Sequence, residues 1–358
     1  LWVADMDFAT APFVTDAIRK RCENEVLGYT GKPDSYYNAI INWVKQRYDL
    51  IVTKEVINFV PGIVPGIGMA MNCFTQKGDK VMIQPPVYHP FAWVTTRNER
   101  TLVINPLRWE NGMYRMDLDA FREQIKGCKL FILCNPHNPG GVVWTEAELR
   151  AIADICYDEK VLVFSDEIHA DLTLPPHTHR PFATVSEKAR MNSVTFMSPS
   201  KAFNMPGLSA SHALIFNEDL RKRFRIYMDA GELDMGHVFA FLSVEAAYSH
   251  GTEWLDQCLA YIQGNIDFVD DFLKNHAPKI KAIRPEASYL VWLDCRELKL
   301  SQKDLNEFFV DKAHLALNDG EMFGKEGIGF MRLNVASPRC IIEKAMKQLA
   351  DAYQLYIK

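Results

Sequence analysis

Short apolar runs alternate along this chain with longer stretches in which apolar residues recur at helical spacing. The runs predict buried strands at residues 56–60, 80–83, 130–134, 161–164 and 194–197. The longer stretches predict helices at residues 12–26, 34–48, 118–125 and 146–158. Strands that alternate with helices are typical of an α/β fold with a mostly parallel central sheet, so we expect that fold class.

The pattern changes after residue 210, where helical spacing dominates. It predicts helices at 218–228, 236–249 and 253–275, followed by strands at 287–293 and 327–335. A chain of 358 residues exceeds the size at which one hydrophobic core keeps growing, so we expect a second, smaller α+β domain. The predicted division is an N-terminal segment 1–27 that packs with the small domain, a large domain 28–255 and a C-terminal small domain 256–358.

Composition narrows the range of partners. With 48% hydrophobic and 24% charged residues, the chain has the make-up of an ordinary soluble enzyme. Its net charge of -5 and its lack of Lys/Arg runs argue against a nucleic-acid partner, because phosphate binding needs a basic face. Prolines and glycines interrupt the most apolar stretch, residues 60–74, so we expect no membrane span and no membrane partner.

The eight cysteines are scattered through apolar stretches without a C-x-x-C pair. We predict buried free thiols rather than disulfides or zinc ligands, and therefore a cytoplasmic protein without a bound metal. The first residues, Leu1 to Phe8, match neither a signal peptide nor an initiator methionine, and we expect further residues upstream.

Four predicted strands end in polar or aromatic side chains that could carry chemistry. The residues are Tyr88, Asn138, Asp166 and, after Ser198 and Ser200, Lys201. Each alone has an ordinary explanation: a packed tyrosine, a rigid Asn-Pro loop, a helix cap or a solvated lysine. Because ligands of parallel sheets bind at the carboxyl ends of the strands, we expect these side chains to meet at one edge. Their joint occurrence indicates a ligand site.

Three further features are ambiguous from the residues alone. Ile63 and Val64 open a helix after a Gly-rich turn whose amides could bind a phosphate, although the dinucleotide-binding spacing is not met. Arg332 lies among apolar residues of a predicted strand and needs either a substrate anion or a structural Asp or Glu partner. Tyr29 lies in a turn and, from that stretch, is best explained as a packed loop aromatic.

Taken in order, these motifs resemble the fold type I enzymes that use pyridoxal 5'-phosphate (PLP). The motifs are Asn-Pro-His-Asn138-Pro, Ser-Asp166-Glu-Ile-His169 and Ser-Pro-Ser-Lys201. Trp-Val-Ala-Asp-Met-Asp-Phe at the start, Gly-Tyr29-Thr and Pro-Pro-Val-Tyr88-His-Pro-Phe are similar to the MalY/PatB group of cystathionine β-lyases, or C–S lyases, within the class I/II aminotransferases. The resemblance covers essentially the whole chain. It implies the aspartate aminotransferase-like PLP-dependent transferase fold, with the cofactor on the large domain.

The resemblance implies roles for the residues around the cofactor. Lys201 would form the Schiff base and then shuttle protons, and Asp166 would keep the pyridine nitrogen protonated. Asn138 would hydrogen-bond the ring 3-oxygen, beside His169, and Tyr88 would stack on the ring. The phosphate would be bound by residues of two turns: Ile63, Val64, Ser198 and Ser200.

Further roles concern the substrate and a second subunit. Arg332 would clamp the α-carboxylate of a small amino-acid substrate next to Asn138 and Tyr88. Tyr29 would reach the phosphate of the neighbouring subunit, which implies a homodimer with shared active sites. Three positions depart from common patterns of the family: His169 replaces a frequent tyrosine and favours the lyases, Ser209 replaces a frequent cation, and Val142 replaces an arginine frequent in the lyases.

The implied reaction is a β-elimination on cystathionine or another S-substituted L-cysteine. Lys201 would remove the Cα proton, a thiolate would leave, and aminoacrylate would hydrolyse to pyruvate and ammonia. An aminotransferase acting on an amino acid and a 2-oxo acid is the alternative, because the same groups serve both reactions. A regulatory protein that keeps the pocket and acts through protein contact is a third, against which the intact Lys201, Asp166 and Arg332 argue.

Overall fold

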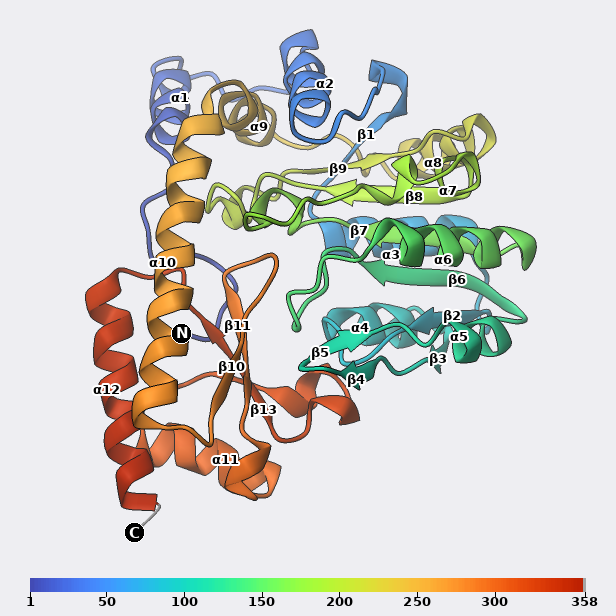
Figure 1. The fold of residues 1–358 in the computed structure, drawn as a ribbon. Helices are drawn as coiled ribbons and strands as arrows, with labels where there is room; N and C mark the ends of the chain where they lie inside the picture. Colours follow the sequence, from blue (N-terminus) through green and yellow to red (C-terminus); the bar gives the residue numbers. More distant parts are fainter. Residues whose placement is uncertain (357–358) are drawn as a thin grey trace.

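The computed structural model describes residues 1–356, which are organised by two main sheets (Figure 1). The larger sheet has seven strands in the order β1-β9-β8-β7-β6-β2-β3, and β9 runs antiparallel to both of its neighbours. These strands are β1 (Ile57–Val60), β2 (Lys80–Ile83), β3 (Thr101–Ile104), β6 (Cys128–Cys134), β7 (Leu162–Asp166), β8 (Ser193–Met197) and β9 (Ser211–Leu214). The predicted mostly parallel α/β sheet is therefore confirmed.

Helices cover both faces of this sheet, because its central strands are apolar on both sides. Leu130 and Ile132 of β6 pack with the helices of one face, while Phe131 and Leu133 pack with those of the other. The first group is α3 (Ile63–Phe74), α4 (Pro90–Arg97) and α8 (Glu218–Ala230), and the second is α5 (Leu118–Gln124), α6 (Glu146–Asp158) and α7 (Glu187–Met191). Thr145 and Glu148 form a capping box at the start of α6.

The C-terminal part has its own antiparallel sheet in the order β10-β11-β13-β12. Its elements are β10 (Lys281–Ile283), β11 (Leu290–Asp294), α11 (Gln302–Glu307), β12 (Asn318–Asp319), β13 (Phe330–Asn334) and α12 (Arg339–Tyr356). The long helix α10 (Thr252–His276) runs beside both parts in Figure 1. The predicted boundary at residue 255 lies in its first turn, and the domain division stays a prediction.

The remaining elements are α1 (Pro12–Cys22), α2 (Asp34–Tyr48), α9 (Val238–His250) and the hairpin β4 (Arg108–Glu110) with β5 (Met113–Arg115). Helix α1 lies against α9, whereas the residues before it bind the small sheet: the Asn334 amide donates to the Leu1 carbonyl at 3.0 Å. Helix α1 ends at Cys22 and not near residue 26, because the Arg21 guanidinium binds the carbonyls of Asn24 and Val26 in a turn.

All eight cysteines are unpaired, as predicted. The prediction that they are buried is wrong for Cys22 and Cys340, which are exposed in the last turn of α1 and the first turn of α12. Between residues 1 and 356, the structure contains no helix with the length and apolar character needed to cross a membrane.

Candidate active site

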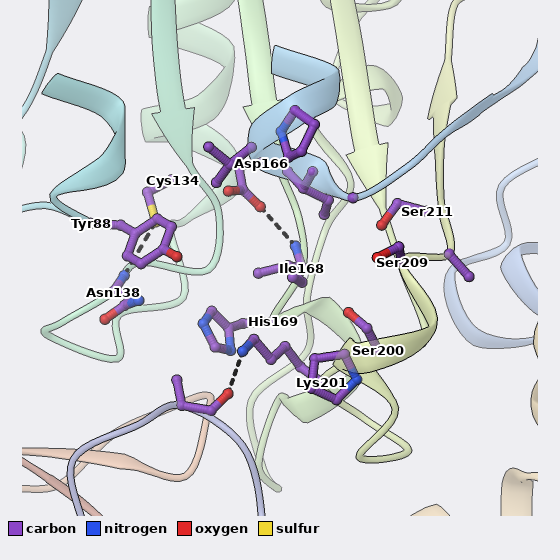
Figure 2. Close-up of a pocket in the computed structure, with 17 residues that line it drawn as sticks. Tyr88, Cys134, Asn138, Asp166, Ile168, His169, Ser200, Lys201, Ser209 and Ser211 are labelled. Atoms are coloured by element: carbon purple, nitrogen blue, oxygen red, sulfur yellow. Dashed lines mark hydrogen bonds between the residues drawn. The ribbon is translucent and has the colours of Figure 1, made fainter. Parts of the chain in front are cut away.

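The carboxyl ends of the parallel strands border a cavity of about 210 Å³ (Figure 2). Strands β2, β6, β7 and β8 place Tyr88, Asn138, Asp166 and Lys201 on its wall. The start of α3, directly after β1, contributes Ile63 and Val64. The wall also includes His169 and Ser200, so most of the residues singled out in the sequence lie together.

Asp166 is a buried carboxylate with few partners. It is 4% exposed, and its Oδ1 accepts one hydrogen bond, from the Ile168 amide at 3.1 Å. No Lys, Arg or His nitrogen of residues 1–356 forms an ion pair with it. Burial raises the pKa of this carboxyl to about 7, although the Ile168 hydrogen bond opposes the shift. A carboxylate in this state needs an N–H donor or a cation from a ligand.

Lys201 reaches the cavity as a half-buried amine. Its Nζ donates a hydrogen bond to the Ala4 carbonyl, drawn as a dashed line in Figure 2. Burial lowers the pKa of Lys201, and the positive charge of Arg332 adds to the lowering, although Asp5 and Asp166 oppose it. A lysine with a lowered pKa is available as a nucleophile and as a proton acceptor, so the alternative of a solvated loop lysine does not fit.

A hydrogen bond joins the loop after β6 to the turn after β2. His137 donates from Nε2 to the Pro86 carbonyl at 2.8 Å, and burial, which lowers the pKa of His137 to about 4, keeps the imidazole neutral. The amide of Asn138 donates to Cys134 Sγ at 3.3 Å. This pairing holds Asn138 and the half-buried Tyr88 on the same side of the cavity, as Figure 2 shows.

His169 is buried and carries no charge at neutral pH. Burial lowers the pKa of its imidazole to about 3, and the positive charges of Lys201 and Arg332 add to the shift. Its Nδ1 has no hydrogen-bond partner among residues 1–356. His169 is therefore a neutral polar group that faces the same cavity as Lys201.

The opposite side of the cavity is rich in N–H and O–H donors. Gly62 precedes α3 with φ of 114°, a conformation that favours glycine, and the first amides of α3 have no partner within the helix. Hydroxyls come from Ser200, Ser209 and Ser211. Ser198 does not line the cavity; its hydroxyl donates to the Ala210 carbonyl at 2.7 Å and accepts from the Ser200 amide at 3.1 Å. Ser198 thus fixes the loop that presents Ser200.

Arg332 lies behind Asn138 and is 3% exposed. Its Nη1 donates to Asn138 Oδ1 at 3.1 Å, its Nη2 donates to Asn318 Oδ1 and to the Trp2 carbonyl, and its Nε has no partner. None of the ion pairs among residues 1–356 contains it, so the structural Asp or Glu partner is absent from that range. Burial lowers the pKa of Arg332 to about 10. A buried cation bound only by neutral acceptors is suited to an anionic ligand.

Tyr29 does not take part in this cavity. Its side chain is 97% exposed, in a loop where Val26 and Leu27 are also 71% and 62% exposed. The interpretation as a packed loop aromatic is wrong, because the loop has no neighbouring element to cover it within this chain.

Some wall residues escaped the sequence analysis. Ser211 begins β9, an antiparallel strand that was not predicted, and Cys134 was considered only as a core thiol. Ala4 contributes a backbone carbonyl, for which a sequence contains no signal. A search for serines just beyond the lysine loop would have found Ser211.

The donor set fits the cofactor that the resemblance implies. Lys201 suits an aldehyde, and the underpaired Asp166 suits a protonated ring nitrogen. The free amides at the start of α3, together with Ser200, suit a phosphate. These groups lie on separate parts of the wall, as the separate parts of PLP require.

Comparisons with known proteins agree with this fit. The family model described as aminotransferase class I and II matches residues 2–349. Cystathionine beta-lyase PatB of Bacillus subtilis is 38% identical over 354 residues, which cover 98% of this chain and 92% of PatB.

Two solved structures extend the comparison. Cystalysin of Treponema denticola, which contains PLP, has a TM-score of 0.97 at 35% identity, over 100% of this chain and 91% of its own. A PLP-bound protein of Clostridium difficile 630 that carries the name aminotransferase has a TM-score of 0.96 at 41% identity, over 99% of this chain and 92% of its own. The expected PLP-dependent transferase fold is confirmed.

Proposed function

The chain belongs to the class I and II aminotransferase family, and on that premise we propose that it is a PLP-dependent C–S β-lyase. It cleaves cystathionine or another S-substituted L-cysteine to pyruvate, ammonia and a thiol. The observation that carries the proposal is a set of three incompletely paired charged groups: Lys201 and Asp166 on the cavity wall, and Arg332 behind Asn138 of that wall. The proposal is supported by the similarity to PatB, which is named a cystathionine beta-lyase, and by the high structural similarity to cystalysin.

Asp166, Tyr88 and Asn138 hold the cofactor ring. When bound, PLP supplies an electron sink for the negative charge that develops on the substrate Cα. Asp166 holds the ring nitrogen through its carboxylate, Tyr88 stacks on the ring, and Asn138 donates to the ring oxygen near the neutral His169. Ile63, Val64 and Ser200 bind the phosphate, while Ser198 supports Ser200.

Arg332 and Lys201 act on the substrate. The guanidinium of Arg332 binds the α-carboxylate, and Asn138, to which it is already bonded, fixes its orientation. Lys201 removes the proton from Cα as an amine with a lowered pKa. The Cβ–S bond then breaks with its electron pair on sulfur, and water converts the remaining three-carbon fragment to pyruvate and ammonia.

A homodimer with shared active sites completes the proposal. The loop with Val26, Leu27 and Tyr29 exposes two aliphatic side chains and a phenol that this chain leaves uncovered. Such a patch is suited to a second copy, in which Tyr29 donates its hydroxyl to the phosphate. Replacement of Tyr29 by Phe is expected to weaken cofactor binding without loss of the dimer, as measured by cofactor titration and sedimentation. The unpaired cysteines support a cytoplasmic location.

An aminotransferase is the second candidate, because the Clostridium difficile relative carries that name. The two reactions share the removal of the Cα proton and differ in the next step. A lyase expels the sulfur leaving group. An aminotransferase instead delivers the proton to a carbon other than Cα and retains the substrate nitrogen for transfer to a 2-oxo acid.

The test is incubation of the cofactor-loaded protein with L-cystathionine and no 2-oxo acid. Pyruvate, ammonia and free thiol are measured together, with Lys201→Ala as the matched control. Release of all three by the wild type alone supports the lyase. Turnover that requires a 2-oxo acid supports the aminotransferase, and no turnover of any amino acid contradicts both.

A further inference from the structure

Residues 1–10 form a strap, a segment without helix or strand that lies beside the cavity. Despite its irregular backbone, the strap is densely bonded to the two parts of the molecule that carry the reacting groups. Two asparagines, Asn204 and Asn334, make most of these bonds.

Asn204 holds the strap from the large-domain side, three residues after Lys201. Its Nδ2 donates to the carbonyls of Met6 and Phe8 at 2.9 and 2.7 Å, and its Oδ1 accepts from the Met6 amide at 3.0 Å. The Asn204 backbone has φ of 51°, a left-handed conformation that asparagine tolerates better than most residues. Its amide group is thus fully used on the strap.

Asn334 holds the strap from the small-domain side, two residues after Arg332 on β13. Its Nδ2 donates to the carbonyls of Val3 and Asp5, both at 2.6 Å, while its Oδ1 accepts from the Ala336 amide at 2.8 Å. The residue between those two carbonyls is Ala4. Asn334 therefore fixes the backbone on both sides of Ala4.

The strap presents two carbonyls to the reacting groups. The Ala4 carbonyl accepts from Lys201 Nζ and from the Tyr289 hydroxyl, the latter at 3.0 Å. The Trp2 carbonyl accepts from Arg332 Nη2 at 3.3 Å. Lys201 follows β8 of the large sheet and Arg332 lies on β13 of the small sheet, and the strap is bonded to both.

We propose that Asn204 and Asn334 are positioning residues, which hold the strap so that the Ala4 carbonyl fixes the Lys201 amine for proton transfer at the substrate Cα. The inference rests on the proposed use of Lys201 as the proton acceptor. Whenever the amine is not joined to the cofactor, it needs an acceptor that keeps it in reach of Cα. A misplacement of about 1 Å can cost on the order of 100-fold in rate.

The test uses the cofactor-loaded protein and L-alanine in deuterated water, with the exchange of the Cα proton followed by NMR. L-Alanine has no leaving group, so the exchange measures proton transfer whether the protein is a lyase or an aminotransferase. Asn204→Gly keeps the left-handed backbone and removes the side chain, and Asn334→Ala removes the second holder. We expect each variant to lower the kcat of exchange on the order of 10- to 100-fold with little change in KM.

Two readouts do not depend on turnover. Amide hydrogen exchange of residues 1–10 should become faster in both variants. The cofactor-free variants should also bind added PLP more slowly, as followed by absorbance. Both asparagines hold the same strap, so the kcat of exchange in the double variant should be no lower than in the more impaired single variant. Independent structural defects would instead give additive losses.

Asn58→Ala is the matched control. Asn58 is also a buried asparagine that donates to two carbonyls, those of Val56 and Ala213 at 3.0 and 3.3 Å, but its hydrogen bonds involve neither the strap nor the residues that hold it. It should lower the Tm without lowering Cα proton exchange. An equal loss of exchange in this control overturns the proposal, because the loss would then reflect general stability.

The proposal is also overturned if amide hydrogen exchange of the strap becomes faster while the Cα proton exchange of the substrate and the uptake of PLP stay unchanged. If an asparagine variant does not fold, Tyr289→Phe, which removes only the second donor to the Ala4 carbonyl, must show a smaller loss of the same kind. Wild-type behaviour of Tyr289→Phe then contradicts the proposal. Absence of exchange in the wild type would contradict the proposed function instead.

Discussion

Asp166 and Glu167 are consecutive buried carboxylates at the end of β7, and the protein pairs them very differently. Glu167 is 1% exposed and accepts from the Ser165 hydroxyl, His179 Nε2 and the Phe182 amide, each at 2.8 Å. Asp166 accepts one bond from a backbone amide and faces the cavity. Glu167 therefore has three hydrogen-bond donors within the chain, whereas Asp166 has one.

Two buried arginines repeat this contrast. Arg100 is 8% exposed and donates to Thr75 Oγ1 at 2.9 Å, to the Thr75 carbonyl at 2.7 Å and to Asn72 Oδ1 at 2.8 Å. Arg332 leaves its Nε without a partner and lies behind Asn138 of the cavity wall. Buried polar groups are normally satisfied, so the exceptions identify where the molecule expects a ligand.

The largest effect is expected from the two carboxylates. Asp166→Asn should lower kcat about 10²- to 10⁴-fold, the range typical of a lost proton-controlling group. Glu167→Gln should retain turnover and lower the free energy of unfolding by about 1–3 kcal/mol, because one of its three donors then meets an amide N–H₂. Steady-state kinetics and thermal unfolding of both variants check the pair. Similar kinetic losses in both would remove the contrast.

The arginine pair should separate binding from stability. Arg332→Ala should raise the KM for amino-acid substrates about 10- to 100-fold, since a charge-assisted bond to the carboxylate is worth about 1.5–3 kcal/mol. Arg100→Ala should leave KM unchanged and lower the Tm. An unaltered KM in Arg332→Ala would assign that arginine a structural role.

The two serines of the lysine loop should differ by a smaller factor. Ser200→Ala should weaken cofactor affinity about tenfold, because one hydrogen bond to the phosphate is lost. Ser198→Ala should lower the Tm of the cofactor-free protein, because the substitution removes the hydrogen bond to the Ala210 carbonyl that stabilises the loop. Cofactor titration and unfolding of both variants test this, and equal Tm losses with equal affinities would contradict the distinction.

The smallest effect concerns pH and the cofactor-free protein. Burial raises the pKa of Asp166 to about 7, above that of an unfolded aspartate, so the folded chain holds a proton that the unfolded chain releases. This contribution to stability is complete below about pH 4 and is lost as the pH rises through 7. The Tm of the wild type relative to Asp166→Asn should therefore fall from pH 4.5 to pH 8.

The comparison of the wild type with Asp166→Asn separates the effect of Asp166 on the Tm from the effects of other titrating groups. Burial lowers the pKa of His137 to about 4 and that of His169 to about 3, and such histidines destabilise the folded state at acid pH, with the opposite sign. Their effect is common to both proteins and cancels. A Tm difference that does not change with pH would contradict the raised pKa.

The sequence predicted that the side chains at the strand ends lie together, because strand periodicity and the parallel sheet bring such ends to one edge. It could not decide whether Arg332 has a carboxylate partner, since pairing depends on the neighbours that the small sheet supplies. The antiparallel strand β9 and its Ser211 were missed because a short strand after a loop has no periodic signal. The Ala4 carbonyl could not be found, because every residue carries one.

The most direct test of the lyase is the amount of L-cystathionine consumed per bound cofactor without any 2-oxo acid. A lyase consumes many molecules of L-cystathionine per cofactor and forms pyruvate, ammonia and thiol in equal amounts, which is the result we expect. A reaction that stops after one molecule per cofactor and resumes only when a 2-oxo acid is added would contradict it and identify an aminotransferase.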